Sequence, residues 1–305
     1  MIAHIAVALS LTLFTPSAAA DALPLPGVGV TYSERAGDPV RLSAYGLGTR
    51  STYLRARGGA TFVRQRALSE AAVSPDARTV AGVPAAYRDG HDALHLTDRA
   101  TGATRRVRTV RKPLTASYVS WSRDSRKVAL TVERKAAGRW RAAGFTVVDV
   151  AAGTARTVLL SGLDPSAGFW WTPAGDLIAR YGDGLRAYRA SDGAVLSTHA
   201  GIGRPTGPED SYSPSGGRLA LWCPPRFAER LCVADPATGR ISRRVAIRPE
   251  AVFGWWDENH VIAVLAHQGG HRLAVVDLNG RTRRALAAIP AGTWTARLWL
   301  GFTRG

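Results

Sequence analysis

Apolar segments alternate along this chain with turns of Pro, Asp, Gly, Asn and Ser, a pattern that predicts β-strands throughout. Residues 118–132, YVSWSRDSRKVALTV, show the unit: an aromatic strand ends at Ser122, a polar turn follows, and a second apolar strand begins. These turn residues preset or tolerate tight-turn dihedral angles. After residue 21 no helical apolar pattern covers 10 or more residues, so the sequence favours an all-β fold.

The unit occurs five times, at intervals of 41 to 50 residues. A third strand follows each copy, and then a glycine-containing turn and an outer, often basic strand, which makes four strands a unit. A recurrence of about 40–50 residues is in the range of β-propeller repeats, in which sheets pack around an axis because one sheet cannot bury both faces alone. The equivalent positions at the first turn are Ser74, Ser122, Thr172, Ser213 and Trp256.

The segments outside the five units predict a sixth blade that is split between the chain ends. Residues 40–45, 52–57 and 60–66 predict three strands, and WTARLWLGF, beginning at Trp294, predicts a single one. If the last strand joins the first three, both chain ends close the ring. We therefore expect a β-propeller of six four-stranded antiparallel blades, with seven as the alternative. The propeller would be one domain, residues 40–305, after an N-terminal extension of residues 21–39.

Residues 1–20 predict a signal peptide. They contain no Lys, Arg, Asp or Glu, and the apolar run from Ile5 to Phe14 is short for a membrane span. Pro16 and the small residues 18–20 suit cleavage after Ala20, although the usual positive N-terminal region is missing. An uncleaved anchor is the alternative. The expected location is therefore extracytoplasmic, secreted or in the cell envelope.

The two cysteines fit an oxidising compartment. Cys223 and Cys232 flank PPRFAERL, which is expected to be the loop between two neighbouring antiparallel strands, so the two residues would be within disulfide reach. Two free buried thiols are the alternative. A zinc site is disfavoured because no histidine lies near them in the sequence.

The chain carries a formal net charge of +17, and 37 of its 40 basic residues are arginine. A positive surface favours anionic envelope polymers, lipid headgroups or nucleic acid as partners. Many of these bases alternate with apolar residues, as in 104–112, so we expect most of them on solvated strand faces. Export would remove nucleic acid as a partner. We expect an unknown protein or anionic envelope component to bind, with peripheral membrane association left open, and we expect a monomer.

The repeat resembles that of the TolB-like propellers, which reads roughly W-S-P-D-G before an apolar strand. Trp121-Ser122, Ser74-Pro75-Asp76 and residues 213–216 carry the resemblance, which extends over most of the mature chain. Pro is replaced by Arg123 and Asp257 in two copies. The resemblance implies an exported interaction module, related to periplasmic scaffold proteins and to the propeller halves of certain peptidases.

A search for catalytic chemistry finds no G-x-S-x-G nucleophile motif, so a peptidase is disfavoured. His267 and His271 form a close histidine pair with two glycines between them, and an exposed hairpin tip accounts for it better than a metal site does. The aspartates of the repeated turns are expected to accept backbone hydrogen bonds there. We predict no catalytic residue, no metal and no cofactor.

The tryptophans are the best candidates for ligand contact. Trp121, Trp171 and Trp255 share one repeat position with Tyr212 and are expected to pack between blades. Trp170 and Trp256 lie beside that position, and neighbouring side chains on a strand point to opposite faces. An additional ring near the channel mouth would stack on a sugar or peptide, and filling of the core is the alternative. The first hypothesis is a non-catalytic envelope binding or scaffold module, and the alternative is a propeller hydrolase or lyase acting on an envelope carbohydrate or lactone.

Overall fold

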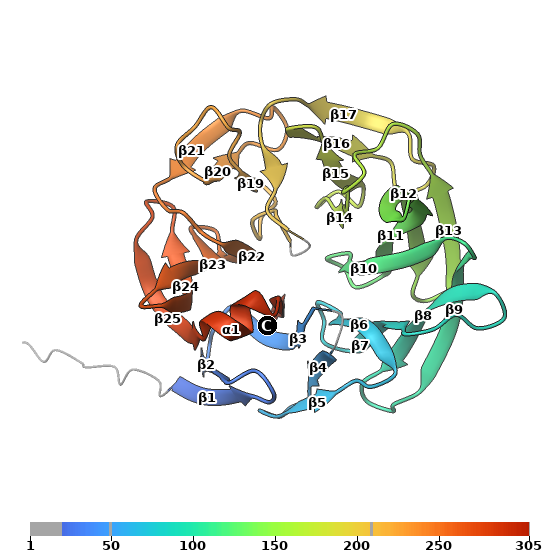
Figure 1. The fold of residues 1–305 in the computed structure, drawn as a ribbon, viewed down its shortest axis with the longest axis horizontal. Helices are drawn as coiled ribbons and strands as arrows, with labels where there is room; N and C mark the ends of the chain where they lie inside the picture. Colours follow the sequence, from blue (N-terminus) through green and yellow to red (C-terminus); the bar gives the residue numbers. More distant parts are fainter. Residues whose placement is uncertain (1–19, 49–50, 208–209, 305) are drawn as a thin grey trace, which may run out of the picture.

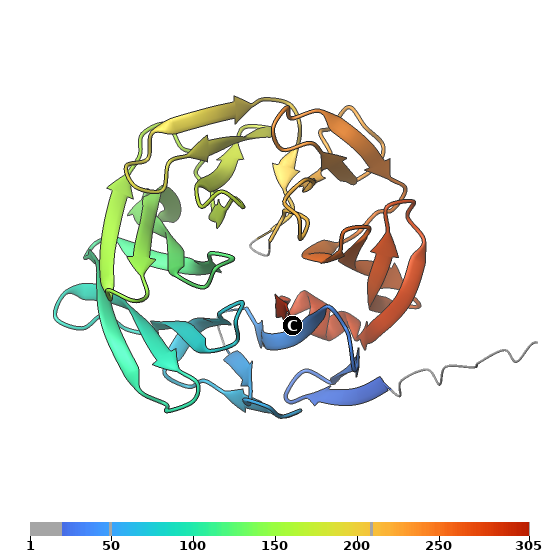
Figure 2. The same cartoon turned by 180° about the vertical axis from the view of Figure 1, so that it is seen from behind.

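The computed structural model describes residues 20–48, 51–207 and 210–304. In these residues, six four-stranded antiparallel sheets form blades around a central axis (Figures 1 and 2). The expected all-β propeller with six blades is confirmed, and the seven-blade alternative is wrong. The leader prediction concerns residues 1–20 and lies outside the described residues except for Ala20, which begins the first strand.

In every blade the strands run in order from the axis to the rim. Blade 1 consists of β26 (Leu298–Arg304), β3 (Val40–Leu47), β4 (Ser51–Arg55) and β5 (Phe62–Arg64). Blade 2 consists of β6 (Leu68–Val73), β7 (Thr79–Pro84), β8 (His91–Asp98) and β9 (Thr104–Arg111). Blade 3 consists of β10 (Thr115–Trp121), β11 (Lys127–Ala136), β12 (Arg139–Asp149) and β13 (Thr154–Leu159).

The remaining blades follow the same order. Blade 4 consists of β14 (Phe169–Trp171), β15 (Leu177–Tyr181), β16 (Gly184–Tyr188) and β17 (Val195–His199). Blade 5 consists of β18 (Arg204–Pro205), β19 (Leu219–Trp222), β20 (Leu231–Ala234) and β21 (Ile241–Val245). Blade 6 consists of β22 (Ala251–Asp257), β23 (His260–His267), β24 (Gly270–Asp277) and β25 (Thr282–Ile289). We call the end of the ring at which the innermost strands begin the upper face.

The two chain ends close the ring, as expected from the sequence. The last strand, β26, pairs antiparallel with β3, from Leu298 opposite Leu47 to Arg304 opposite Val40. The expected strand beginning at Trp294 starts later, because α1 (Ala291–Thr295) forms a short helix before it. Pro290 precedes this helix, and proline suits a helix start because its missing N–H needs no partner there.

A hairpin that the sequence analysis did not anticipate occupies the N-terminal extension. β1 (Ala20–Leu25) and β2 (Val30–Arg35) pair with each other, and the hairpin lies at the rim beside blades 6 and 1 (Figure 1). Tyr32 is fully buried in the hydrophobic cluster that these blades share. Arg284 on β25 donates to the Ser33 carbonyl at 2.9 Å and pairs with Asp38 at 2.6 Å. The extension thus covers the junction at which the ring closes.

The tryptophans of the shared repeat position link neighbouring blades. The indole N–H of Trp121 donates to the Ala72 carbonyl at 3.1 Å, and that of Trp171 to the Ser120 carbonyl at 2.9 Å. Trp255 repeats the contact with the Ser211 carbonyl at 2.9 Å. Each acceptor lies on the inner segment of the preceding blade, one residue before the position in that blade that corresponds to the tryptophan. The repeated tryptophan therefore packs between blades, as expected, and also supplies a directed bond.

The repeated turns use their polar side chains locally. Ser74 and Ser122 each donate to an aspartate two residues later, at 2.6 Å. The strand-end carboxylate of Asp235 accepts the N–H groups of the next turn at 2.9 Å, and these bonds hold its pKa below the usual range. Asp98 makes the equivalent bonds at 2.8 Å. The aspartate series is therefore structural, as the sequence analysis expected.

No helix in the described ranges is long and apolar enough to cross a membrane.

A Trp171→Phe substitution tests the inter-blade bond. It keeps an aromatic ring but removes the donor to the Ser120 carbonyl, which is left buried without its partner. We expect the free energy of unfolding in urea to fall by about 1–3 kcal/mol. The matched control is Trp140→Phe, at a ring that is 49% exposed, where we expect a change within about 0.5 kcal/mol. Equal effects of the two substitutions would contradict this role of the indole.

Candidate functional site

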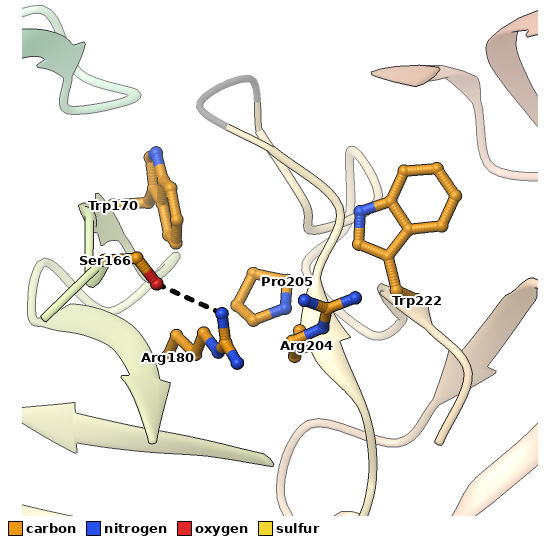
Figure 3. A pocket seen from close by; sticks show the side chains of 6 residues that line it. All are labelled: Ser166, Trp170, Arg180, Arg204, Pro205 and Trp222. Atoms are coloured by element: carbon orange, nitrogen blue, oxygen red, sulfur yellow. Dashed lines mark hydrogen bonds between the residues drawn. The ribbon is translucent and has the colours of Figure 1, made fainter. Parts of the chain in front are cut away.

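A pocket of about 200 Å³ opens on the upper face between blades 4 and 5 (Figure 3). It is assembled from segments of both blades, namely β14 and the link before it, the ends of β15 and β19, and the short inner strand β18. We call it the blade 4–5 pocket. Its lining residues are Ser166, Trp170, Arg180, Arg204, Pro205 and Trp222.

Arg180 is held in place by three groups. Its guanidinium pairs with Asp164 at 3.1 Å, and it donates to the Ser166 hydroxyl and the Gly182 carbonyl, each at 3.1 Å. The Asp164 side chain is only 15% exposed. Because its partners fix the guanidinium in advance, a ligand that contacts Arg180 loses little side-chain freedom on binding.

Two tryptophans stand on opposite sides of the two guanidinium groups (Figure 3). The Trp170 ring lies over Gly168, where a Cβ atom would approach the ring to 2.7 Å, so a glycine is needed at this position. The indole N–H of Trp222 donates to the Thr206 carbonyl at 3.0 Å, which orients that ring. Pro205 lies between them and adds an apolar surface.

Arg204 supplies an exposed positive charge to the pocket. Its side chain is exposed, and no carboxylate of the described residues lies within ion-pair distance of it, whereas Asp164 compensates Arg180. Within the part of the chain that the structure describes, the pocket therefore combines one guanidinium that no carboxylate compensates with aromatic faces. Such a site can pair with a carboxylate, sulfate or phosphate while a flat apolar ring or sugar face stacks on an indole.

The structure separates the two tryptophans that the sequence analysis singled out. Trp170 lines the blade 4–5 pocket. Trp256 is 8% exposed and belongs to the hydrophobic cluster around blades 6 and 1, with the guanidinium of Arg284 5.6 Å from its ring centre. The site proposed below therefore uses Trp170 and not Trp256.

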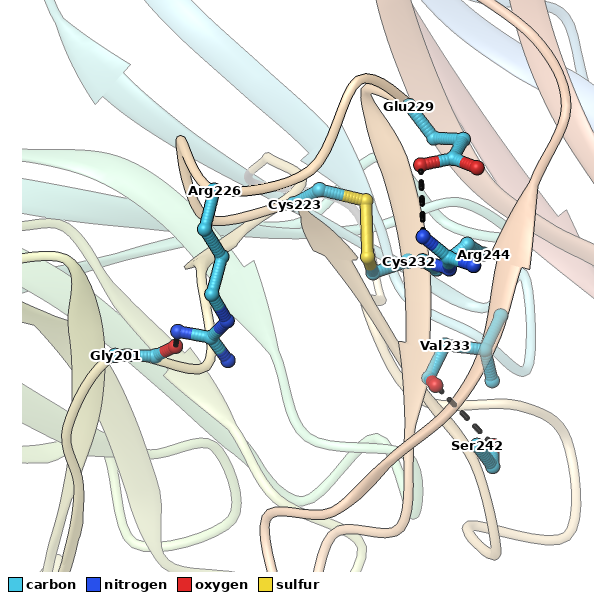
Figure 4. The surroundings of a disulfide bond; sticks show 8 residues. All are labelled: Gly201, Cys223, Arg226, Glu229, Cys232, Val233, Ser242 and Arg244. Atoms are coloured by element: carbon cyan, nitrogen blue, oxygen red, sulfur yellow. Dashed lines mark hydrogen bonds and ion pairs between the residues drawn. A yellow bond between two sulfur atoms is a disulfide. The ribbon is translucent and has the colours of Figure 1, made fainter.

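Cys223 and Cys232 form a disulfide, as the sequence analysis expected (Figure 4). Cys223 directly follows β19 and Cys232 lies on β20, with their Cα atoms 5.0 Å apart. The bond closes the loop on the upper face next to Trp222, and Arg226 at the loop tip donates to the Gly201 carbonyl at 2.7 Å. The disulfide thus secures one wall of the blade 4–5 pocket.

A second polar group lies where the inner strands of blades 2 and 3 meet. Glu70 accepts the backbone N–H groups of Tyr118 at 2.8 Å and of Val119 at 2.6 Å, across a β-bulge in β10. Tyr118 has a φ of 60° and its ring is 51% exposed. Such a backbone conformation is costly for a bulky residue, and Glu70 holds it in place.

Glu133 lies beside this bulge and accepts the Ser117 hydroxyl at 3.1 Å. Burial raises the pKa of Glu133 above the usual carboxyl range. Burial also raises the pKa of Glu70, and the charge of Glu133 adds to this effect, against the two backbone N–H bonds. We call Glu70 and Glu133 the inner-strand carboxylates. Each of them therefore keeps its proton to a higher pH than Asp98 or Asp235 does.

The histidines do not form a metal site in the described part of the chain. His267 and His271 lie on either side of the β23–β24 hairpin turn, as the sequence analysis expected, but both are half-buried where an exposed tip was expected. His267 contacts Arg272, and the His271 ring lies 5.2 Å from that of Trp294. Among the described residues, no group of three or more His, Cys, Asp or Glu is placed to bind a metal ion.

Sequence reasoning identified one wall of the blade 4–5 pocket and missed the rest. Arg180, Arg204 and Trp222 lie at strand ends of two different blades and outside the shared repeat position. Trp222 and Arg180 each follow an apolar strand segment, and this was the available sequence signal for the pocket. Nothing in the spacing indicated that blades 4 and 5 bring these residues together.

No protein-family model matches this sequence, and no curated protein matches it. Solved propeller structures are similar to it. One is an oligogalacturonate lyase in complex with manganese, with 15% identity, a TM-score of 0.56, and coverage of 88% of this chain and 84% of that one. The propeller domain of the Trilobed protease from Pyrococcus furiosus has 13% identity and a TM-score of 0.51, with coverage of 88% and 84%.

TolB from Acinetobacter baumannii is also similar, with 19% identity and a TM-score of 0.48. The match covers 87% of this chain but only 65% of the TolB chain. At such identities these neighbours show the fold alone. The six-bladed fold is consistent with the TolB-like resemblance of the repeat.

Replacing both cysteines by serine tests the disulfide. The bond closes a loop of sequence separation 9, so its loss should lower the free energy of unfolding by roughly 2–3 kcal/mol. Urea unfolding with and without reductant measures this. Reductant should destabilise the wild type by a similar amount and leave the Cys223→Ser/Cys232→Ser variant unchanged. If the free energy of unfolding of the wild type is unchanged once the disulfide is fully reduced, the bond does not stabilise the fold.

Proposed function

We propose that this chain is an exported binding or scaffold module of the cell envelope, and that the blade 4–5 pocket holds an anionic group of its ligand. The observation that carries the proposal is that the Arg204 guanidinium, which no carboxylate of the described residues compensates, lines the same pocket as the indoles of Trp170 and Trp222. The disulfide supports an extracytoplasmic location, because such bonds persist in oxidising compartments.

The size of the pocket limits what it can hold. Sites for drug-sized ligands measure roughly 300–1,000 Å³. A pocket of about 200 Å³ suits one sugar ring or one side chain, such as the end or a single unit of a longer partner. We therefore propose a carboxylated sugar unit or an acidic peptide group as the part of the ligand that enters.

Titration of the full chain with galacturonate, and with neutral galactose as the uncharged counterpart, tests the pocket. We expect galacturonate to bind and galactose to bind at least about tenfold more weakly, because a charge-assisted hydrogen bond contributes about 1.5–3 kcal/mol. Arg204→Ser should weaken galacturonate binding by a similar factor. Arg126→Ser is the matched control, because Arg126 is exposed on the opposite face.

Each outcome of this titration bears on the proposal. An acidic peptide is titrated as a third probe, and its binding in place of galacturonate, lost in Arg204→Ser, would identify a protein as the partner. If neither galacturonate nor the peptide binds, or if the Arg204→Ser variant binds as well as the wild type, the pocket is not the ligand site.

The inner-strand carboxylates support a second candidate function, a propeller hydrolase or lyase acting on an envelope carbohydrate. Two carboxyl groups with raised pKa values adjoin the exposed Tyr118. General acids at near-neutral pH need such raised pKa values. The fold is also similar to that of an oligogalacturonate lyase. In this alternative the two carboxyl groups act as acid and base.

Incubation of the full chain with polygalacturonate, followed by detection of new chain ends, tests this alternative. If Glu133 is the acid, the rate should fall as the pH rises through its raised pKa, since the proton is then lost. Glu133→Gln should reduce the rate at least about a hundredfold, in line with the usual contribution of a general acid. Glu250→Gln, at an exposed position, is the control. A rate unchanged by Glu133→Gln would exclude this role.

A further inference from the structure

The β11–β12 hairpin of blade 3 is the longest in the described structure. β11 has 10 residues and β12 has 11, and they pair up to Ala136 opposite Arg139. Ala137 and Gly138 form the two-residue turn, with φ values of 49° and 78°, as in the tight turns that match strand twist. The corresponding β23 in blade 6 has 8 residues, so the blade 3 hairpin extends roughly 7 Å further on the upper face.

The end of this hairpin, residues 134–141, concentrates positive charge; we call it the hairpin tip. Its four basic side chains are exposed, and none has a carboxylate partner within ion-pair distance among the described residues. The only nearby acidic residue in the hairpin, Glu133, accepts the Ser117 hydroxyl. The basic residues are Arg134, Lys135, Arg139 and Arg141.

The pairing of the strands makes this charge unfavourable for the isolated protein. Arg134 lies directly opposite Arg141, and like charges in this position destabilise a sheet. Arg139 projects from the same face of the hairpin, since side chains two residues apart share a face. An anionic partner would remove this repulsion.

An aromatic ring accompanies the charge. Trp140 pairs with Lys135 on the other face of the hairpin and is 49% exposed, although indoles are usually well covered in folded proteins. Tryptophan is enriched at membrane–water interfaces, where its ring and its N–H are both accommodated. An exposed indole between basic residues is the composition of segments that bind the surface of anionic membranes.

We propose that the hairpin tip docks on an anionic phospholipid surface, with its basic groups at the lipid phosphates and the Trp140 ring among the headgroups. A projecting tip can reach a flat surface, whereas a polymer such as nucleic acid binds along a groove or a row of contacts. This inference is independent of the blade 4–5 pocket, which involves no residue of the tip.

Vesicle sedimentation with the full chain tests the proposal. We expect binding to vesicles of phosphatidylglycerol and phosphatidylcholine, and little binding to phosphatidylcholine alone. Replacing the four basic tip residues by serine should weaken binding by at least about a hundredfold, because each basic residue near such a surface contributes roughly fivefold. Trp140→Ser should weaken vesicle binding severalfold. This loss should depend less on salt concentration than the loss in the four-residue variant, since the indole contact is not ionic.

A matched variant removes the same charge from the opposite face. Arg78, Arg126, Arg240 and Arg281 are exposed in turns of that face, and their joint replacement by serine should change vesicle binding far less. Thermal unfolding shows whether each variant is folded, and the tip variant should be at least as stable as the wild type, because the repulsion between Arg134 and Arg141 is gone.

Two results would overturn the inference. One is equal vesicle binding by the tip variant and the opposite-face variant, which would mean that only net charge matters. The other is stronger binding to duplex DNA or soluble polygalacturonate than to phosphatidylglycerol vesicles, unaffected by Trp140→Ser. That result would assign the tip to a polyanion and not to a lipid surface.

Discussion

The pairing of β26 with β3 is the constraint on which the ring depends. It joins residues from the two ends of the described chain, from Leu298 opposite Leu47 to Arg304 opposite Val40. No blade can bury both of its faces alone, so each needs a neighbour on either side, and a ring supplies them only when it is closed. The blade 4–5 pocket has walls from two blades, and its shape therefore relies on a closure made in blade 1.

The sequence predicted the repeated features and two single ones, the ring closure and the disulfide, but it missed other features that occur once. The five phrases, the three tryptophans at their shared position, the turn aspartates and the disulfide pair could all be predicted, because local strand and turn chemistry determines them. The β1–β2 hairpin and the helix α1 occur once, so no comparison between copies revealed them. Arg204 could not be assigned to a pocket from its position, since its neighbours there are Trp170 and Arg180 of another blade.

The arginines have a larger structural role than their alternation with apolar residues indicated. Arg123, in a blade 3 turn, donates to the Ser213 carbonyl at 2.7 Å and pairs with Asp210 at 2.8 Å, which ties blade 3 to blade 5. Arg304 donates to the Trp255 carbonyl at 3.0 Å, and burial lowers the pKa of its guanidinium. Part of the net charge of +17 therefore holds blades together. At the blade 4–5 pocket and the hairpin tip, by contrast, arginines remain exposed to a partner.

Native-state hydrogen exchange of the amides in β26 and β3 tests the closure most directly. If the ring is held shut by this pairing, the amides should exchange only through global unfolding, with the same opening free energy as the amides of the buried β23–β24 pair. Exchange from β26 and β3 at a much lower free energy, while the other five blades stay fully protected, would show that the blades form a stable structure without the closure.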